Sequence, residues 1–167
     1  TDKRVNEVTK TLFKKYRTPK DFADAGPEIF RQEIRSTGFY NSKAKNIINT
    51  SKIIVDKFRG RVPGTMEELL TLPGVARKTA NVVLNNVFGK VEGVVVDTHV
   101  KRLSRRLGLS DSDDPVKIER DLMAAVPKRD WEKISYLLID HGRAVCRAKN
   151  PDHRICVLRK ICPSNGI

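Results

Sequence analysis

Apolar residues recur every three or four positions along most of the chain, the spacing that places them on one face of an α-helix. Only residues 94–96 read as strand-like, and three residues are too few to build a sheet. Gly and Pro residues break the helical stretches into short segments. The pattern therefore predicts an all-α protein of many short helices. The predicted helix faces contain Val5, Val8, Leu12, Phe13, Ile47, Ile48, Ile53, Ile54, Phe58, Val82, Val83, Leu84, Val87, Val100, Leu103, Leu107, Ile118, Leu122, Val126, Ile134, Leu137 and Leu138.

The composition of the chain shifts near residues 89–93, where glycines and charged residues follow a helical stretch. No internal repeat and no low-complexity linker is visible in the sequence. We therefore expect the seam between two domains at this point, with one domain over residues 1–91 and the other over residues 92–167.

The charge of the chain is strongly positive, with 33 Lys and Arg against 20 Asp and Glu and a net charge of +13. Such a charge favours a polyanionic partner, either nucleic acid or an anionic membrane surface. No apolar run approaches the roughly 20 residues needed to span a bilayer, which excludes a membrane-spanning class. The chain does not begin with Met, so targeting signals could lie outside it.

All three cysteines lie close to the C-terminus, between residues 146 and 162. An odd number of clustered cysteines is a poor disulfide framework and is more typical of a metal site. Cysteines that bind metal and form no disulfides indicate a reducing compartment.

Residues 65–88 predict a helix–hairpin–helix. A helix that ends at Leu70 is followed by residues 72–76 (LPGVA) and by a second helix from Arg77. Gly74 can adopt the positive φ that a tight hairpin needs. Backbone N–H groups at the start of the second helix can bind a phosphate without reading base sequence. An ordinary αα-hairpin gives the same pattern, and the net charge favours the DNA-binding interpretation.

Lys78 occupies the first turn of that second helix. The positive end of the helix dipole and the neighbouring Arg77 both disfavour a protonated amine there, which favours a nucleophile. A lysine that contacts phosphate or solvent explains the same position, and position alone favours this second interpretation.

Asp97 follows an apolar segment and precedes a helical one. Asp is a favoured N-cap residue, and capping contributes about 1 kcal/mol. A carboxylate that the cap keeps ionised and fixed in direction could also oppose positive charge that develops on a sugar. The two roles are compatible.

Several segments are recognisable in combination: residues 72–84 (LPGVARKTANVVL), 96–100 (VDTHV) and 141–143 (HGR), supported by 38–44 (GFYNSKA) and 61–63 (RVP). Together they resemble the endonuclease III family of the helix–hairpin–helix DNA glycosylase superfamily, and the similarity extends over the whole chain. The resemblance implies a two-domain, all-α helix–hairpin–helix DNA glycosylase fold that ends in a C-terminal metal-cluster loop.

The resemblance also implies residue roles. Lys78 would attack C1′ of a damaged nucleotide and Asp97 would assist. Relatives that only excise the base lack this lysine, so Lys78 indicates lyase activity as well. Phe39 falls at the position of a wedge inserted into the duplex, although a hydrophobic turn residue packed on its own helices is an alternative. The implied DNA-binding residues are Phe39, Asn41, Lys43, Gly74, Ala76, Arg77 and His99.

Two features depart from the family pattern outside the metal site. Ala76 stands where the family usually has a second Gly, and its methyl group is a mild obstacle to close phosphate approach. The family also has an N-terminal helical region before the segment that matches Thr1 and Asp2. It includes a Gln that contacts the orphaned strand, and we expect this region to be missing here.

The family motif Cys-x6-Cys-x2-Cys-x5-Cys holds a [4Fe–4S] cluster and falls here on Cys146, His153, Cys156 and Cys162. Thiolates are the usual ligands, so His153 would be an unusual fourth ligand. A tetrahedral Cys₃His zinc site, a cluster with a weak or lost ligand, and His153 as an exposed loop residue are the alternatives. Basic residues around these positions could contact phosphate or only solvent: Arg147, Lys149, Arg154, Arg159 and Lys160.

The resemblance therefore predicts a monomeric enzyme of base excision repair, a bifunctional DNA glycosylase and abasic-site lyase. Its expected partner is double-stranded DNA that contains damaged bases, above all oxidised pyrimidines, or abasic sites, and not a membrane. A non-enzymatic helix–hairpin–helix DNA-binding module is the main alternative, and a glycosylase for mismatched thymine or oxidised purine is another. We expect it at the nucleoid in a bacterial cytoplasm, or in an organelle or nucleus of a eukaryote.

Overall fold

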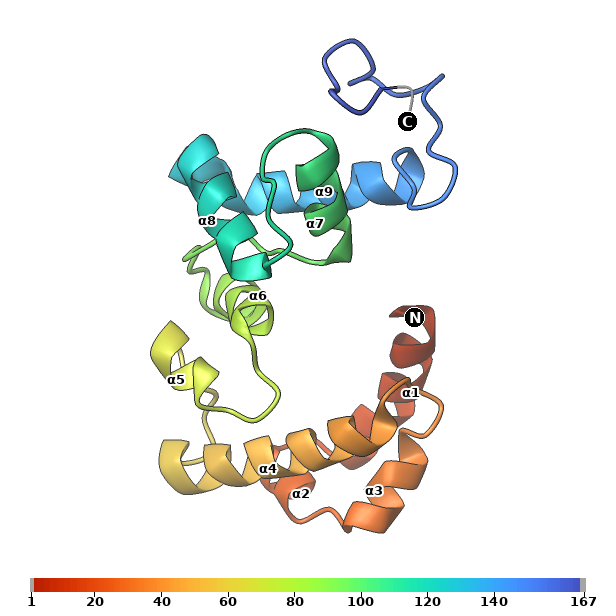
Figure 1. Cartoon of the computed structure of the whole chain (residues 1–167). Coiled ribbons are helices and arrows are strands. Elements are labelled where there is room, and N and C mark those ends of the chain that lie inside the picture. The colour runs from red at the N-terminus through yellow and green to blue at the C-terminus, as the bar shows by residue number, and fades with distance from the viewer. Residues whose placement is uncertain (1, 166–167) are drawn as a thin grey trace. The chain divides into compact units, whose positions relative to one another are not determined.

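The computed structural model describes residues 2–165 and contains helices and irregular segments, with no strand among those residues (Figure 1). The all-α prediction is confirmed, and residues 94–96 pair in a sheet with no other part of the chain that the structure describes. The elements are α1 (Asp2–Lys15), α2 (Pro19–Ala23), α3 (Pro27–Glu33), α4 (Tyr40–Phe58), α5 (Met66–Leu70), α6 (Arg77–Phe88), α7 (Thr98–Arg106), α8 (Pro115–Ala125), the 3₁₀ turn η1 (Lys128–Asp130) and α9 (Trp131–Ala144).

The chain packs as two compact units, Thr1–Ala76 and Arg77–Ile167. The seam expected at residues 89–93 therefore lies inside the second unit. Units defined by internal packing need not coincide with domains, so the division at residue 91 stays a prediction. Lys78 and Asp97 belong to the same unit, and each can be described in its local surroundings there.

The core of the first unit is built around Phe30 of α3, which has no exposed surface. The ring of Phe30 meets those of Tyr16 and Phe22 edge-on, at centroid distances of 5.3 and 5.9 Å. Tyr16 also donates its hydroxyl to Glu33 Oε2 at 2.9 Å. Burial of one such ring contributes about 2 kcal/mol. The cluster is completed by Leu12, Ala25, Ile34, Ala44 and Ile48.

The core of the second unit joins α7, α8 and α9. Val100 and Leu103 of α7 and Leu122 of α8 have no exposed surface. Trp131 at the start of α9 donates its indole N–H to the Val126 carbonyl at 2.9 Å. The residues that close the core are Val94, Val96, Ile118 and Leu138, so the segment before α7 is itself part of the core.

Three residues expected on buried helix faces are exposed: Phe13 is 60% exposed, Val87 66% and Leu137 54%. Consecutive helical residues point about 100° apart, because one turn contains 3.6 residues. Phe13 and Leu137 are chain neighbours of the buried Leu12 and Leu138, so they point away from the core. The apolar pattern identified the helices correctly and assigned these side chains wrongly.

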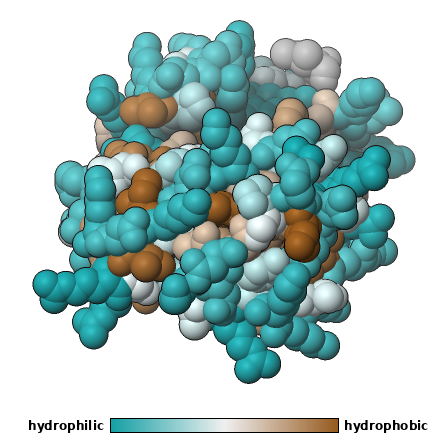
Figure 2. Space-filling model, turned by 90° about the horizontal axis from the view of Figure 1, so that it is seen from below, coloured by the Kyte–Doolittle hydropathy of each residue, from teal (hydrophilic) through white to brown (hydrophobic). Residues whose placement is uncertain are grey.

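Hydrophilic side chains cover most of the face shown in Figure 2, and hydrophobic residues form small separate patches between them. Among the helices of residues 2–165, none combines the length and the apolar composition that a membrane crossing requires.

Candidate active site and cysteine loop

The hairpin that precedes α6 is held by α4. Gly74 has a φ of +78°, the left-handed value that the sequence predicted for it. A Cβ on Gly74 would lie 2.5 Å from Nδ2 of Asn46, so the backbone approaches α4 closely. Thr50 of α4 donates its hydroxyl to the Pro73 carbonyl at 2.9 Å. The predicted hairpin is confirmed, and Ala76 is exposed at its end.

Lys78 lies in the first turn of α6 and is exposed. The neighbouring Arg77 is engaged elsewhere: its Nε and Nη2 donate to Oε2 and Oε1 of Glu119 at 2.8 and 2.9 Å. This hydrogen-bonded carboxylate raises the pKa of Arg77 above its usual value. The charge of Arg77, which was expected to act on Lys78 together with the helix dipole, is thus opposed by the Glu119 carboxylate.

Asp97 is the N-cap of α7, as predicted. Its Oδ1 accepts the backbone N–H groups of His99 and Val100, both at 2.8 Å. The cap uses one carboxylate oxygen and leaves Oδ2 outside these hydrogen bonds. Because the side chain is only partly buried, Oδ2 can face a substrate while Oδ1 fixes the direction of the carboxylate.

His99 packs inside the second unit next to α9. Its Nδ1 lies 3.2 Å from Nη2 of Arg102. A Cβ on Gly142 would lie 3.0 Å from the same ring atom. Contacts within the protein thus account for the position of this ring, and its DNA contact stays a prediction.

Phe39 lies in the turn directly before α4. It has a left-handed backbone, with φ 57°, and its side chain is 88% exposed. A hydrophobic turn residue packed on its own helices would be covered, so that alternative is wrong. Asn41 and Lys43 follow in the first turn of α4 and are also exposed.

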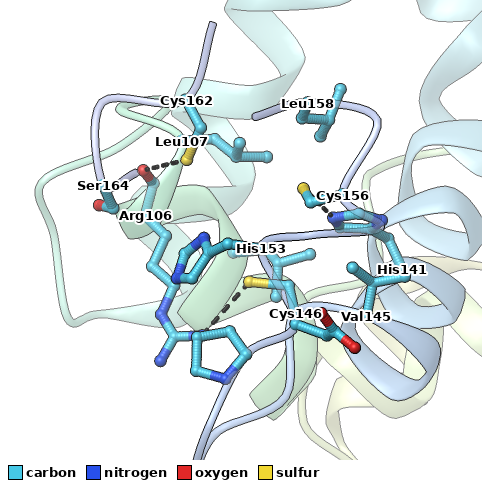
Figure 3. Close-up of a pocket in the computed structure, with 13 residues that line it drawn as sticks. Arg106, Leu107, His141, Val145, Cys146, His153, Cys156, Leu158, Cys162 and Ser164 are labelled. Atoms are coloured by element: carbon cyan, nitrogen blue, oxygen red, sulfur yellow. Dashed lines mark hydrogen bonds between the residues drawn. The ribbon is translucent and has the colours of Figure 1, made fainter. Parts of the chain in front are cut away.

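The three cysteines and His153 line one cavity of about 90 Å³, together with His141 of α9 (Figure 3). Cys146 follows the end of α9, and the other ligand candidates lie in the turns after it. Nε2 of His153 is buried without a hydrogen-bond partner among the described residues. His153 is therefore not the exposed loop residue that one alternative required.

The donor types around this cavity suit a metal group. Thiols and an imidazole are ligands of iron–sulfur clusters and of zinc, and the buried Nε2 of His153 lacks another partner. Within residues 2–165, no three His, Cys, Asp or Glu side chains already converge as a metal site. The fit to such a group therefore rests on the donor chemistry and on the shared cavity.

Arginines of α7 hold the start of the cysteine loop. Arg106 donates Nη1 to Cys146 Sγ at 3.2 Å and to the Arg147 carbonyl at 2.8 Å. Arg102 donates Nη2 to the carbonyls of Gly142 and Cys146, both at 3.0 Å. These arginines have no local signature in the sequence, because contacts across some 40 residues leave no local pattern.

Comparison with known proteins agrees with this architecture. Residues 1–128 match the HhH-GPD superfamily of base excision DNA repair proteins. The chain is 55% identical to endonuclease III of Synechocystis sp. over 164 residues, covering 98% of the chain and 75% of that protein. It is 47% identical to endonuclease III of Bacillus subtilis, covering 97% of the chain and 74% of that protein.

Solved structures give the same result. The structure of a trapped endonuclease III–DNA covalent intermediate matches with a TM-score of 0.94 and 44% identity, over 99% of this chain and 78% of that one. A thermostable thymine-DNA glycosylase matches with a TM-score of 0.82 at 22% identity, over 99% of this chain and 77% of that one, which shows a shared fold. The chain belongs to the HhH-GPD superfamily and, within it, to the endonuclease III family.

Proposed function

We propose that the chain is a bifunctional DNA glycosylase and abasic-site lyase of base excision repair. It acts on duplex DNA with damaged bases, oxidised pyrimidines above all, or with abasic sites. The observation that carries the proposal is Lys78, exposed in the first turn of α6 after a helix–hairpin–helix. A related endonuclease III, 44% identical to this chain, has been trapped in a covalent intermediate with DNA.

The first step is exposure of the target nucleotide. A base inside a duplex is out of reach, so the nucleotide rotates out at a cost of a few kcal/mol. The exposed ring of Phe39 inserts into the vacated space and offsets part of that cost. The backbone N–H groups after Gly74 contact a phosphate, and Asn41 and Lys43 contact the DNA near Phe39.

The chemistry is covalent catalysis by an amine. The amine of Lys78 attacks C1′ with its lone pair, the glycosidic bond breaks and the base leaves with its electron pair. The Oδ2 of Asp97 stabilises the positive charge that develops on the sugar or accepts a proton. The nitrogen then loses a proton and the C1′–O4′ bond breaks, which opens the sugar ring and leaves a protonated imine between Lys78 and C1′. This imine acidifies the C2′ hydrogens. Loss of one of them expels the 3′ phosphate, and the strand is cut by β-elimination.

Cys146, His153, Cys156 and Cys162 would hold a [4Fe–4S] cluster, with zinc as the alternative. His153 lines the same cavity as the thiols and its Nε2 is buried without a hydrogen-bond partner among the described residues, which supports its place in the set. When bound, the group supplies cross-links between the turns of the loop and no step of the reaction. The free thiols of all three cysteines suit the reducing cytoplasm of a bacterium, where the DNA substrate lies at the nucleoid.

The test is covalent trapping. The protein is incubated with duplexes that carry an oxidised pyrimidine, a mismatched thymine, an oxidised purine or an abasic site, each in the presence of borohydride. The expected result is an adduct with the oxidised pyrimidine and the abasic duplex, mapped by mass spectrometry to the peptide that contains Lys78.

Two variants make this result decisive. Lys78→Ala should form no adduct while keeping nearly all of its DNA affinity. Lys78→Arg should also fail, because a guanidinium stays protonated and cannot attack carbon. An adduct of equal yield in Lys78→Ala would contradict the nucleophile. Tight duplex binding by the unaltered protein without any adduct would favour a non-enzymatic DNA-binding module.

A further inference from the structure

Glu119 of α8 is a buried carboxylate whose side chain is only 4% exposed. Charged groups rarely lie inside a protein unless each oxygen has a partner. Both oxygens of Glu119 accept from Arg77, at 2.8 and 2.9 Å. Oε1 also accepts Nδ2 of Asn81 at 2.9 Å. The carboxylate therefore has three donors, all from α6.

These donors tie Glu119 to the start of the helix that carries Lys78. Arg77 is the residue directly before Lys78, and Asn81 lies on the same helix about one turn later. A two-point contact between a guanidinium and a carboxylate fixes orientation as well as distance. The side chain of Glu119 in α8 thus bonds to one residue before Lys78 and to one residue after it, and so fixes the first turn of α6.

The same carboxylate contacts the segment that leads to Asp97. A Cβ on Gly93 would lie 2.0 Å from Oε1 of Glu119, so the backbone of Gly93 lies directly against this oxygen. After Gly93 the chain is fixed by the buried Val94 and by the N–H of Val95, which donates to Ser135 Oγ at 3.0 Å. Gly93 is therefore the start of a rigid approach to Asp97.

We propose that Glu119 is a positioning residue that sets the first turn of α6, with Lys78, relative to the segment that presents Asp97. This role rests on the proposed function. A displacement of about 1 Å between a nucleophile and its partner can slow a reaction about 10²-fold. Loss of the Glu119 charge leaves Arg77 without its carboxylate and releases both segments from a shared contact.

The experiment measures adduct formation with an abasic duplex at saturating DNA, in single turnover, together with duplex affinity. Glu119→Gln should lower the saturated rate about 10²-fold and change affinity far less. Glu119→Asp keeps the charge on a shorter side chain and should restore part of the rate. The matched control is Asp121→Asn on the same helix, which loses the same charge and a 2.5 Å hydrogen bond with Ser110. It should keep the rate of the unaltered protein.

A second measurement tests the geometry without activity. Gly93→Ala should lower the denaturant midpoint strongly, because its methyl group would meet Oε1 of Glu119 at 2.0 Å and, less closely, Nδ2 of Asn81 at 2.9 Å. In the Glu119→Ala background, Gly93→Ala should lower the denaturant midpoint clearly less, because the carboxylate oxygen that the new methyl group would meet is absent. This cycle and Glu119→Asp keep the proposal testable if Glu119→Gln does not fold.

Each outcome has a distinct meaning. An unchanged saturated rate in Glu119→Gln, with no adduct in Lys78→Ala, would overturn the positioning role and leave the proposed function standing. If the stability losses of Gly93→Ala and Glu119→Ala simply add in the double variant, the proposed contact between Gly93 and Glu119 is contradicted. An adduct in Lys78→Ala would overturn the proposed nucleophile and, with it, the role of Glu119.

Discussion

Oδ1 of Asp97 accepts the backbone N–H of Val100 at 2.8 Å, so the carboxylate proposed to act on the sugar also begins α7. One residue therefore contributes to folding and to chemistry through different oxygen atoms. A substitution that keeps the cap and removes the charge separates the two contributions.

We predict that Asp97→Asn folds nearly as well as the unaltered protein but excises bases about 10²-fold more slowly. Asn is as good an N-cap as Asp, whereas it carries no charge toward the sugar. Asp97→Ala should also lose about 1 kcal/mol of unfolding free energy. Denaturant unfolding and single-turnover excision measure the two effects.

The control for this prediction is Asp114→Asn. Asp114 caps α8 by accepting the Lys117 N–H at 2.8 Å, and it lies outside the proposed chemistry. Equal excision rates in Asp97→Asn and Asp114→Asn would contradict a catalytic role for Asp97.

Phe39→Ala should impair excision without harming the fold. The side chain is 88% exposed, so its removal should change the unfolding free energy by less than about 0.5 kcal/mol. If the ring offsets about 1.4 kcal/mol of the cost of base flipping, excision from a paired duplex falls about tenfold.

The effect of Phe39→Ala should shrink when the target base lies in an unpaired bubble, because less pairing must be broken. Phe13→Ala is the matched control, since Phe13 is another exposed ring, at 60%, on α1. An equal loss in both variants, or the same loss on bubble and duplex, would contradict the wedge role.

Gly74→Ala should destabilise the protein and weaken duplex binding. Its positive φ of +78° disfavours a side chain, and the new methyl group would meet Asn46 at 2.5 Å. We expect a loss of about 1–2 kcal/mol in unfolding free energy from the backbone alone. Gly38→Ala is the control, because a Cβ at Gly38 has no neighbour within 4 Å. Equal midpoints for both variants in denaturant would show that the hairpin tolerates a side chain.

The metal prediction concerns His153. Purified protein should be brown and contain about four irons per chain, with visible thiolate-to-iron absorption. His153→Cys should retain iron longer under a chelator, because thiolate is the usual ligand. Colourless protein with about one zinc per chain would favour the zinc site. Lower iron occupancy in His153→Cys would show that residue 153 is not a ligand position.

The features that the sequence predicted well are local. The positive φ of Gly74 and the cap at Asp97 follow from the chemistry of single residues and their immediate neighbours. The pairing of Glu119 with Arg77 spans 42 residues and has no periodic signature. The same holds for Arg106 and Cys146, 40 residues apart. Such pairs depend on how helices pack, and a single sequence does not reveal that.

The left-handed turn at Phe39 has a consequence for the thermodynamics of recognition. A residue other than glycine held at φ 57° costs on the order of 1 kcal/mol, and this cost is met when the chain folds. Ordering a flexible loop at the moment of association would instead subtract from the binding free energy. With the ring already presented outward, encounter with a duplex requires little further loss of conformational entropy in this part of the protein.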